Sequence, residues 1–132
     1  EHIYLSSFRE QRGMLHTVVK VDYRKLNIIN IHLGLDDEER GIQIRELLDF
    51  IKKLGDEPYI VVGDFNQGGV TVEEDILKDV AKELGKSNIL TFPTGLDRID
   101  YIFVSSNIEV IDYDVIIKDM SDHYPVFAKI KI

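Results

Sequence analysis

Four short polar motifs interrupt otherwise apolar stretches of the 132-residue chain, and each carries side chains that can hold a proton or a metal ion. In chain order they are Asn30-Ile31-His32, Gly63-Asp64-Phe65-Asn66, Arg98-Ile99-Asp100 and Ser121-Asp122-His123. Burying a polar group without a partner costs about 1–3 kcal/mol, so such interruptions mark either paired or functional residues. These four motifs are the candidate functional site.

Each motif taken alone also has an ordinary structural explanation. His32 can cap the edge of a sheet, and Gly63-Asp64-Phe65-Asn66 is equally typical of a turn, because Gly, Asp and Asn favour turns. Asp100 lies inside an apolar stretch, so it needs either a salt bridge or a histidine beside it. Asp122-His123 is either an exposed turn or a hydrolytic pair in which Asp122 binds metal and His123 handles a proton.

Together and in this order, the four motifs resemble those of the endonuclease/exonuclease/phosphatase (DNase I-like) superfamily. Thr91-Phe92-Pro93 and Glu10-Gln11-Arg12-Gly13 also resemble segments of that family, so the similarity covers nearly the whole chain. The resemblance implies divalent-metal-dependent hydrolysis of a phosphate ester by a phosphodiesterase, nuclease or phosphatase, with Mg²⁺ or Mn²⁺ as the cofactor. It does not select the phosphate-ester substrate, and nucleic acid is among the candidates.

The resemblance also implies a role for each polar residue. His123 would act at the attacking water with Asp100 orienting it, and His32 would bond a phosphate oxygen or the leaving group. Asp64 and Asn66 would position the nucleophile and stabilise the transition state, which suits a reaction that depends on positioning and charge neutralisation. The expected catalytic residues are therefore His32, Asp64, Asn66, Asp100 and His123. The expected metal ligands are Asp122, Asp64 and Asn66.

The chain is about half as long as members of that family, which have the length of one large domain. Their N-terminal half supplies an asparagine on the first strand and the principal metal-binding glutamate, and no segment here matches either one. We therefore expect residues 1–132 to form a single partial domain whose N-terminal half is absent. That half, or a second chain, would cover the inner face of the sheet.

The absent glutamate also leaves an alternative function open. The chain could be a non-catalytic binding or scaffold module that keeps the fold without the metal site. A structural role would not require all six polar residues, which argues against that alternative. The six are His32, Asp64, Asn66, Asp100, Asp122 and His123.

The elements that must position these residues follow from the hydrophobic periodicity. Strands are expected at 14–21, 26–33, 59–63, 99–104, 108–117 and 126–132, the first two forming an antiparallel hairpin. Apolar residues at three- and four-residue steps predict a helix over 36–54, and a capping box at Thr71-Val72-Glu73-Glu74 predicts a second helix that ends at Gly85. The fold class is α+β, the C-terminal half of a four-layer α/β/β/α sandwich, with a mixed, mainly antiparallel sheet and helices on one face.

Composition narrows the function classes further. With 16 Lys+Arg against 24 Asp+Glu, the net charge of −8 disfavours tight non-specific binding to long DNA. Arg9 and Arg12 are the candidate phosphate-binding residues, although surface arginines are more often only solvated. The absence of cysteine excludes disulfides and thiolate metal sites and fits a cytoplasmic location. No apolar run approaches the roughly 20 residues of a membrane span.

Overall fold

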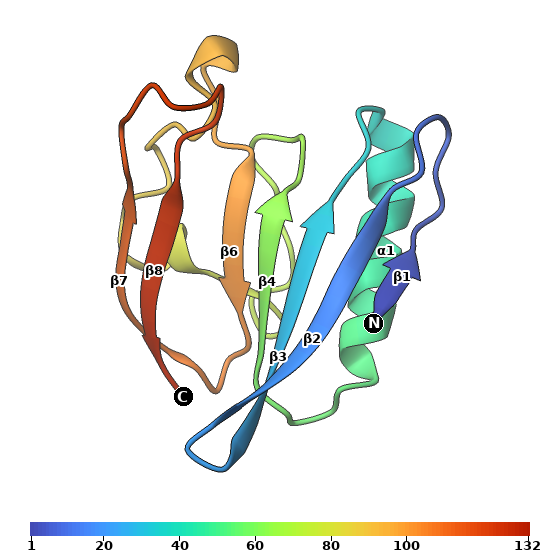
Figure 1. Cartoon of the computed structure of the whole chain (residues 1–132), viewed down its shortest axis with the longest axis vertical. Coiled ribbons are helices and arrows are strands. Elements are labelled where there is room, and N and C mark those ends of the chain that lie inside the picture. The colour runs from blue at the N-terminus through green and yellow to red at the C-terminus, as the bar shows by residue number, and fades with distance from the viewer.

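A six-stranded sheet dominates the computed structural model, which describes residues 1–132, and a separate two-stranded sheet lies beside it (Figure 1). The large sheet has the order β1-β2-β3-β4-β6-β5. Its strands are β1 (His2–Tyr4), β2 (Gly13–Val21), β3 (Arg24–His32), β4 (Tyr59–Asp64), β5 (Lys78–Asp79) and β6 (Asp100–Val104). The small sheet pairs β7 (Glu109–Val115) with β8 (Val126–Lys131).

The sheet is mixed and mainly antiparallel, as the sequence predicts. β2 and β3 form the expected hairpin, and β3–β4 is the one parallel pair. A parallel pair needs a crossover connection, which here is α1 (Asp37–Lys52), packed against one face of the sheet (Figure 1). Asp36 caps this helix by accepting hydrogen bonds from the backbone N–H groups of Glu38 and Glu39 at 2.9 and 3.2 Å.

Two apolar clusters lie on opposite faces of the large sheet. The first cluster lies under α1, where Leu47 and Ile51 pack on strand residues such as Ile29 and Val61. The second cluster lies between the opposite face and the β7–β8 pair, and it includes Val104 and other buried residues. We call this opposite face the inner face.

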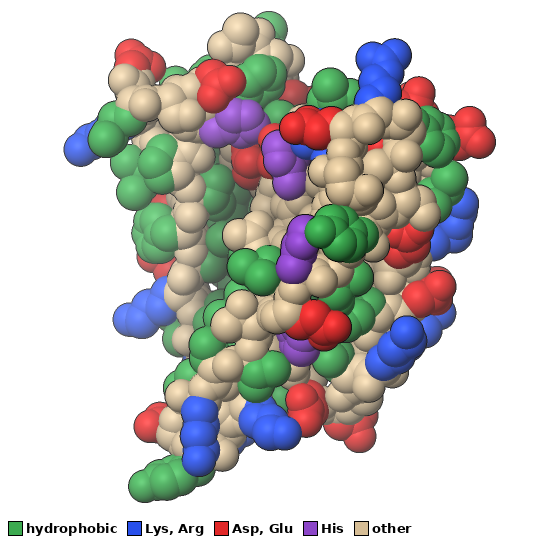
Figure 2. Space-filling view, turned by 45° about the vertical axis from the view of Figure 1, so that its right-hand side comes forward, with side chains coloured by type: hydrophobic (Ala, Val, Ile, Leu, Met, Phe, Trp, Pro, Cys, Tyr) green, Lys and Arg blue, Asp and Glu red, His purple; other side chains and the backbone are tan.

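The inner face is only partly covered. Leu15 on β2 is 49% exposed, and Ile28, Val62 and Ile102 on the neighbouring strands are half-buried. In Figure 2, hydrophobic side chains are visible in the hollow between the left-hand part of the molecule and the rest. On β8 the predicted alternation is present, with half-buried residues such as Ala128 alternating with exposed ones such as Lys129.

The second predicted helix is largely wrong. Residues 71–77 form turns and irregular structure, Lys78–Asp79 pairs with β6 as β5, and only α2 (Val80–Glu83) is helical. The N-cap is Asp79, whose side chain accepts from the Ala81 N–H at 3.1 Å. Pairing with the sheet edge outweighs the local capping preference, because it brings the buried Leu77 into the first cluster. The structure contains no helix with both the length and the apolar character needed to cross a membrane.

Candidate active site

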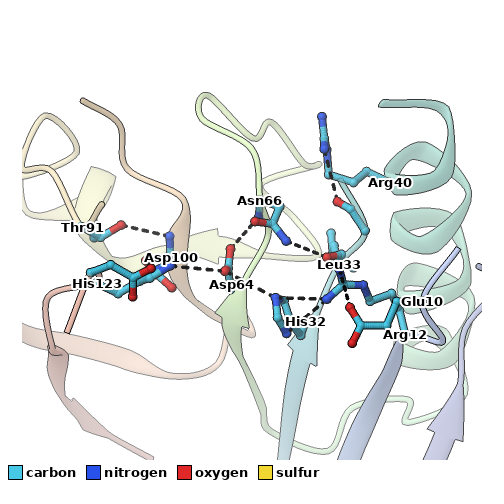
Figure 3. A network of polar contacts seen from close by, with 12 residues as sticks. Glu10, Arg12, His32, Leu33, Arg40, Asp64, Asn66, Thr91, Asp100 and His123 are labelled. Atoms are coloured by element: carbon cyan, nitrogen blue, oxygen red, sulfur yellow. Dashed lines mark hydrogen bonds and ion pairs between the residues drawn. The ribbon is translucent and has the colours of Figure 1, made fainter. Parts of the chain in front are cut away.

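Three polar residues stand in one row across neighbouring strands at one end of the large sheet. His32 on β3 is in register with Asp64 on β4, and Asp64 is in register with Asp100 on β6. Residues opposite one another on neighbouring strands share a face of the sheet, so the three side chains lie side by side on the inner face (Figure 3). The loop between β7 and β8 adds His123 above this row. Residues from four distant segments therefore meet at one end of the sheet.

His123 and Asp100 form a carboxylate–histidine pair. His123 Nδ1 donates to Asp100 Oδ2 at 2.8 Å, and Phe92 packs against the imidazole with ring centroids 4.8 Å apart. Burial alone would lower the pKa of His123, but the Asp100 hydrogen bond and the charges of Asp100, Asp64 and Asp122 raise it above its ordinary value of 6.5. Because Nδ1 is occupied, Nε2 is the ring nitrogen available for proton transfer.

Asp64 stands between two imidazoles. Its Oδ2 lies 3.7 Å from His123 Nε2 and 3.5 Å from His32 Nε2, whose side chain is 59% exposed. The two rings approach the same carboxylate oxygen from opposite sides, His32 from β3 and His123 from the β7–β8 loop, as Figure 3 shows. In the space-filling view, histidine and acidic side chains correspondingly lie next to one another near the upper end of the molecule (Figure 2).

The end of β4 fixes the Asp64 carboxylate. Gly63 has a φ of +145°, and a Cβ there would lie 1.8 Å from the Ile31 carbonyl oxygen, so only glycine fits between β3 and β4. Asp64 Oδ1 then accepts the Asn66 backbone N–H at 2.7 Å, and Asn66 Nδ2 donates to the Leu33 carbonyl at 2.8 Å. The predicted turn and the predicted site are thus the same structure, because the turn aims both side chains.

Thr91 supports Asp100 from the opposite end of the row. This fully buried residue accepts the backbone N–H groups of Ile99 and Asp100 on its Oγ1 at 3.0 and 3.1 Å. Its carbonyl accepts the Tyr124 N–H at 2.8 Å, which ties the residue after His123 to the same point. Thr91 therefore sets the relative positions of the two partners of the pair.

Arg12 is the positive group nearest the row. Its side chain is only 11% exposed, its Nη2 pairs with Glu10 Oε2 at 3.2 Å, and its Nη1 lies 3.3 Å from His32 Nε2 (Figure 3). The other candidate phosphate-binding residue, Arg9, is exposed and has no hydrogen bond or ion pair in the structure. Arg12 belongs to the network around His32, whereas Arg9 lies apart from it.

The predicted site residues therefore fall into two groups. The structure brings together His32, Asp64, Asn66, Asp100, His123 and Arg12. Asp122 is exposed. Its Oδ1 accepts a hydrogen bond from the Ser121 hydroxyl at 3.1 Å, and it does not contact the residues of the row. It remains next to the row in sequence and contributes its charge to the pKa of His123.

The sequence interpretation missed a buried polar network on the first turns of α1. Gln43 Oε1 accepts the Gly34 N–H at 2.8 Å and its Nε2 donates to the Ser6 carbonyl at 2.9 Å. Glu39 Oε1 accepts the Phe8 N–H at 3.0 Å, and Arg40 Nε donates to Gln67 Oε1 at 3.2 Å. These bonds join the loops that carry Arg12, follow His32 and follow Asn66. The helical spacing indicates this network. Residues four positions apart lie on the same face of a helix, so Gln43 and Glu39 share the buried face with Leu47 and Ile51.

The residues present fit a hard divalent cation. Ligand atoms of Asp64, Asp100 and His123 lie within 4.8 Å of one another. Carboxylate and amide oxygens suit Mg²⁺ and Mn²⁺, and Mg²⁺ in such sites commonly takes only one or two carboxylates from the protein. Asp100 and His123 already bond each other, so Asp64 would be the best placed ligand, with the unbonded Oδ1 of Asn66 two residues further along the chain.

Comparisons with curated proteins give two groups of distant relatives. The chain is 23% identical to a phospholipase C of Staphylococcus aureus, covering 89% of this chain and 50% of the relative. It is 26% identical to the uncharacterized protein YbhP of Escherichia coli strain K12, covering 93% of this chain and 54% of the relative. The chain spans about half the length of these curated relatives.

Solved structures show the same fold. Danio rerio TDP2 complexed with a single-strand DNA product superimposes with a TM-score of 0.83 at 22% identity, over 100% of this chain and 66% of that one. The human Nocturnin catalytic domain with bound sulfate gives 0.82 at 20% identity, over 99% and 57%. A Bacteroides thetaiotaomicron mannosyl-6-phosphatase gives 0.79 at 23% identity, over 92% and 58%. The chain therefore has the DNase I-like fold that its motifs predict.

The family model extends across the whole row of site residues. The model described as the endonuclease/exonuclease/phosphatase family matches residues 5–123, from the loop before β2 to the histidine of the carboxylate–histidine pair. All four polar motifs lie inside that match. By this match, which covers most of its length, the chain belongs to the endonuclease/exonuclease/phosphatase family.

Proposed function

We propose that this chain carries the C-terminal part of the active site of a divalent-metal-dependent phosphoric ester hydrolase, in which water attacks phosphorus. The observation that carries the proposal is the Asp100–His123 pair at 2.8 Å, with His123 Nε2 directed at Asp64 3.7 Å away. Phosphoryl transfer needs a group that handles the proton of the water and groups that neutralise charge on the phosphate. Both kinds of group are present in one row.

Each residue of the row has a task in this reaction. His123 takes the proton of the attacking water on Nε2, and Asp100 holds the ring and stabilises the imidazolium that results. Asn66 and Asp64 position the water and the phosphate. His32 and Arg12, 3.3 Å apart, stand on the other side of Asp64, where they would contact phosphate oxygens or the departing oxygen.

Mg²⁺ or Mn²⁺ would be held by Asp64 together with Asn66, and Asp122 would support the site from its exposed position. When bound, the cation would neutralise negative charge on the phosphate. The three carboxylates near His123 would otherwise repel an anionic substrate, which supports a requirement for a cation. The names of relatives point to different esters: a phospholipase C, a mannosyl-6-phosphatase and TDP2 with a DNA product.

The proposal includes a second layer over the inner face of the sheet. That face is partly open at Leu15, and the chain spans only about half of its curated relatives. A further part of the full-length protein, or a second chain, would cover the face and supply additional metal ligands. An inner face packed in this way would be typical of a sheet-on-sheet sandwich.

The proposal is tested with full-length protein and two chromogenic probes, p-nitrophenyl phosphate and bis(p-nitrophenyl) phosphate. We expect hydrolysis of at least one probe with Mg²⁺ or Mn²⁺ and none in a chelator. Asp64→Asn should lower kcat at least about a hundredfold, because it removes a positioned charge from the reaction centre. Asp49→Asn, an exposed carboxylate of α1, is the matched control and should leave kcat unchanged. Absence of metal-dependent turnover would instead favour a non-catalytic module.

A further inference from the structure

A pocket of about 460 Å³ opens directly beside the candidate active site, between the loop that joins β1 to β2 and the start of α1. Arg12 lines this pocket and also lies 3.3 Å from His32, so the pocket and the site share a wall. In Figure 3, Arg12 and Glu10 lie between His32 and the helix. The volume lies within the range of about 300–1,000 Å³ that is usual for small-molecule sites.

The pocket lies on one particular side of the reacting centre. In the row, His32 and the His123–Asp100 pair stand on opposite sides of Asp64. The entering water and the departing oxygen lie roughly in line on opposite sides of phosphorus. With the water at His123, the alcohol part of the ester lies on the His32 side, which is the side of the pocket.

The pocket wall mixes charges of both signs. Two guanidinium groups, those of Arg9 and Arg12, alternate with three carboxylates, those of Glu10, Asp36 and Glu39. Hydroxyl groups both donate and accept hydrogen bonds, so such a wall suits a hydroxyl-rich ligand. A nucleic acid strand would bring further phosphates against the carboxylates, and an alkyl chain would strip water from charged groups without replacing the lost hydrogen bonds.

Two further features fit a sugar or polyol. Glu39 is 4% exposed, and its Oε1 accepts the Phe8 N–H at 3.0 Å and the Gln43 Nε2–H at 3.4 Å, while its Oε2 lies against Gly34 and accepts no hydrogen bond. That oxygen is a preorganised acceptor for a ligand hydroxyl. Phe8 and Leu35 are 52% and 70% exposed at the pocket and supply apolar surface for the carbon skeleton of a ring.

We propose that this pocket binds the alcohol part of the phosphate ester and selects a sugar or polyol. The inference rests on the proposed function, since it assigns the substrate class of the same site. The pocket is formed by the β1–β2 loop, the loop before α1 and the first turn of α1.

The test compares esters of a primary alcohol in full-length protein with Mg²⁺. The value of kcat/KM for glucose 6-phosphate is compared with the values for hexyl phosphate and for a dithymidine phosphodiester. The methyl phosphate diester of each alcohol is also tested as a substrate. We expect kcat/KM for the sugar ester to exceed that for the hexyl ester at least about tenfold, the effect of one or two net hydrogen bonds. Leu35→Trp, which narrows the pocket, should reduce this preference at least about fivefold, which corresponds to the loss of about one hydrogen bond. Met120→Trp, at a position that is also largely exposed but lies outside the pocket, should preserve the preference.

The outcomes separate this inference from the proposed function. Turnover without a sugar preference, preferential cleavage of the dinucleotide or hexyl ester, or a preference that survives Leu35→Trp would overturn the inference and leave the hydrolase intact. If no ester is hydrolysed, the proposed function fails. The binding of glucose 6-phosphate to the pocket is then the only remaining test of this inference. Glucose 6-phosphate should then shift the amide NMR signals of Phe8 and Leu35, and unchanged signals at millimolar ligand would refute the pocket.

Discussion

At the scale of single residues, the proposed chemistry depends on how the imidazole of His123 is held. Asp100 accepts from His123 Nδ1, Phe92 packs on the ring, and Thr91 fixes the backbone of Asp100. The family resemblance implied the pair itself, whereas the residues alone indicated only that a carboxylate on an apolar strand face needs a salt bridge or a histidine beside it. They did not predict the contribution of Thr91, since an apolar-flanked threonine looks like an ordinary strand or turn residue until the bonds of its hydroxyl are known.

The first prediction concerns the titration of His123 in the metal-free chain. Its pKa is raised above 6.5 by the Asp100 bond and the neighbouring carboxylates, against the opposing effect of burial. Asp100→Asn should therefore lower the pKa of His123, as followed by NMR titration of the ring signals. Asp49→Asn is the matched control, and an equal pKa in the wild type and Asp100→Asn would contradict the role of the pair.

The same shift predicts a pH dependence of stability. A histidine whose folded pKa lies above its unfolded value stabilises the fold fully below the unfolded pKa of about 6.5, and this contribution disappears as pH rises through the folded pKa. The free energy of unfolding of the wild type should therefore exceed that of Asp100→Asn most at acidic pH. Denaturant unfolding between about pH 5 and 8, above the range in which model carboxylates titrate, measures this difference, and a gap that widens with rising pH in that window would be the wrong sign.

Another residue-scale prediction concerns Thr91→Val. Valine has nearly the same shape but leaves the buried N–H groups of Ile99 and Asp100 without their acceptor. We expect a loss of about 1–3 kcal/mol in the free energy of unfolding. Thr71→Val, at an exposed position outside the strands and helices, is the matched control and should change stability by less than about 0.5 kcal/mol.

At the scale of elements, α1 serves both packing and positioning. Its apolar stripe packs on the sheet, and the same stripe continues into Gln43 and Glu39, which bind the loops around the site. Periodicity predicted the helix well, because a long amphipathic pattern and its cap agree. It failed at Thr71–Glu74, because a short capping signal could not reveal that Lys78 and Asp79 pair with β6.

The third prediction therefore concerns Gln43→Leu. Leucine would leave the Gly34 N–H and the Ser6 carbonyl unpaired in a buried position, so we expect a loss of about 2–4 kcal/mol in the free energy of unfolding. Hydrogen exchange at the Gly34 amide should accelerate in the variant. Arg45→Leu lies on the exposed side of α1 and is the control. Equal stabilities of the two variants would show that the network is dispensable.

At the scale of the whole molecule, the arrangement of the two faces is the main feature. α1 covers one face of the large sheet, while the inner face carries the row of site residues and stays partly open. The motifs predicted the family, while the shared face of the row follows from the register of β3, β4 and β6. The second layer over the inner face could not be predicted in detail. Which residues it buries depends on its contacts with the sheet, and these contacts are not encoded in local sequence patterns.

The fourth prediction uses the absence of cysteine from these 132 residues. Leu15 and Val18 lie on opposite faces of β2 and are 49% and 50% exposed. In full-length protein, a thiol introduced as Leu15→Cys should be protected from a thiol reagent by the covering layer, whereas Val18→Cys should react. Equal reactivity at both positions would argue against a second layer over the inner face.

The most direct test of the account is the effect of His123 on turnover by the full-length protein with Mg²⁺. Removing a positioned general base typically costs about 10²–10⁴ in rate, so His123→Ala should lower kcat for bis(p-nitrophenyl) phosphate or p-nitrophenyl phosphate by at least about a hundredfold. Asp114→Ala, an exposed carboxylate of β7, is the control and should leave kcat unchanged. A metal-dependent activity that persists in a folded His123→Ala variant would contradict the central role assigned to the Asp100–His123 pair.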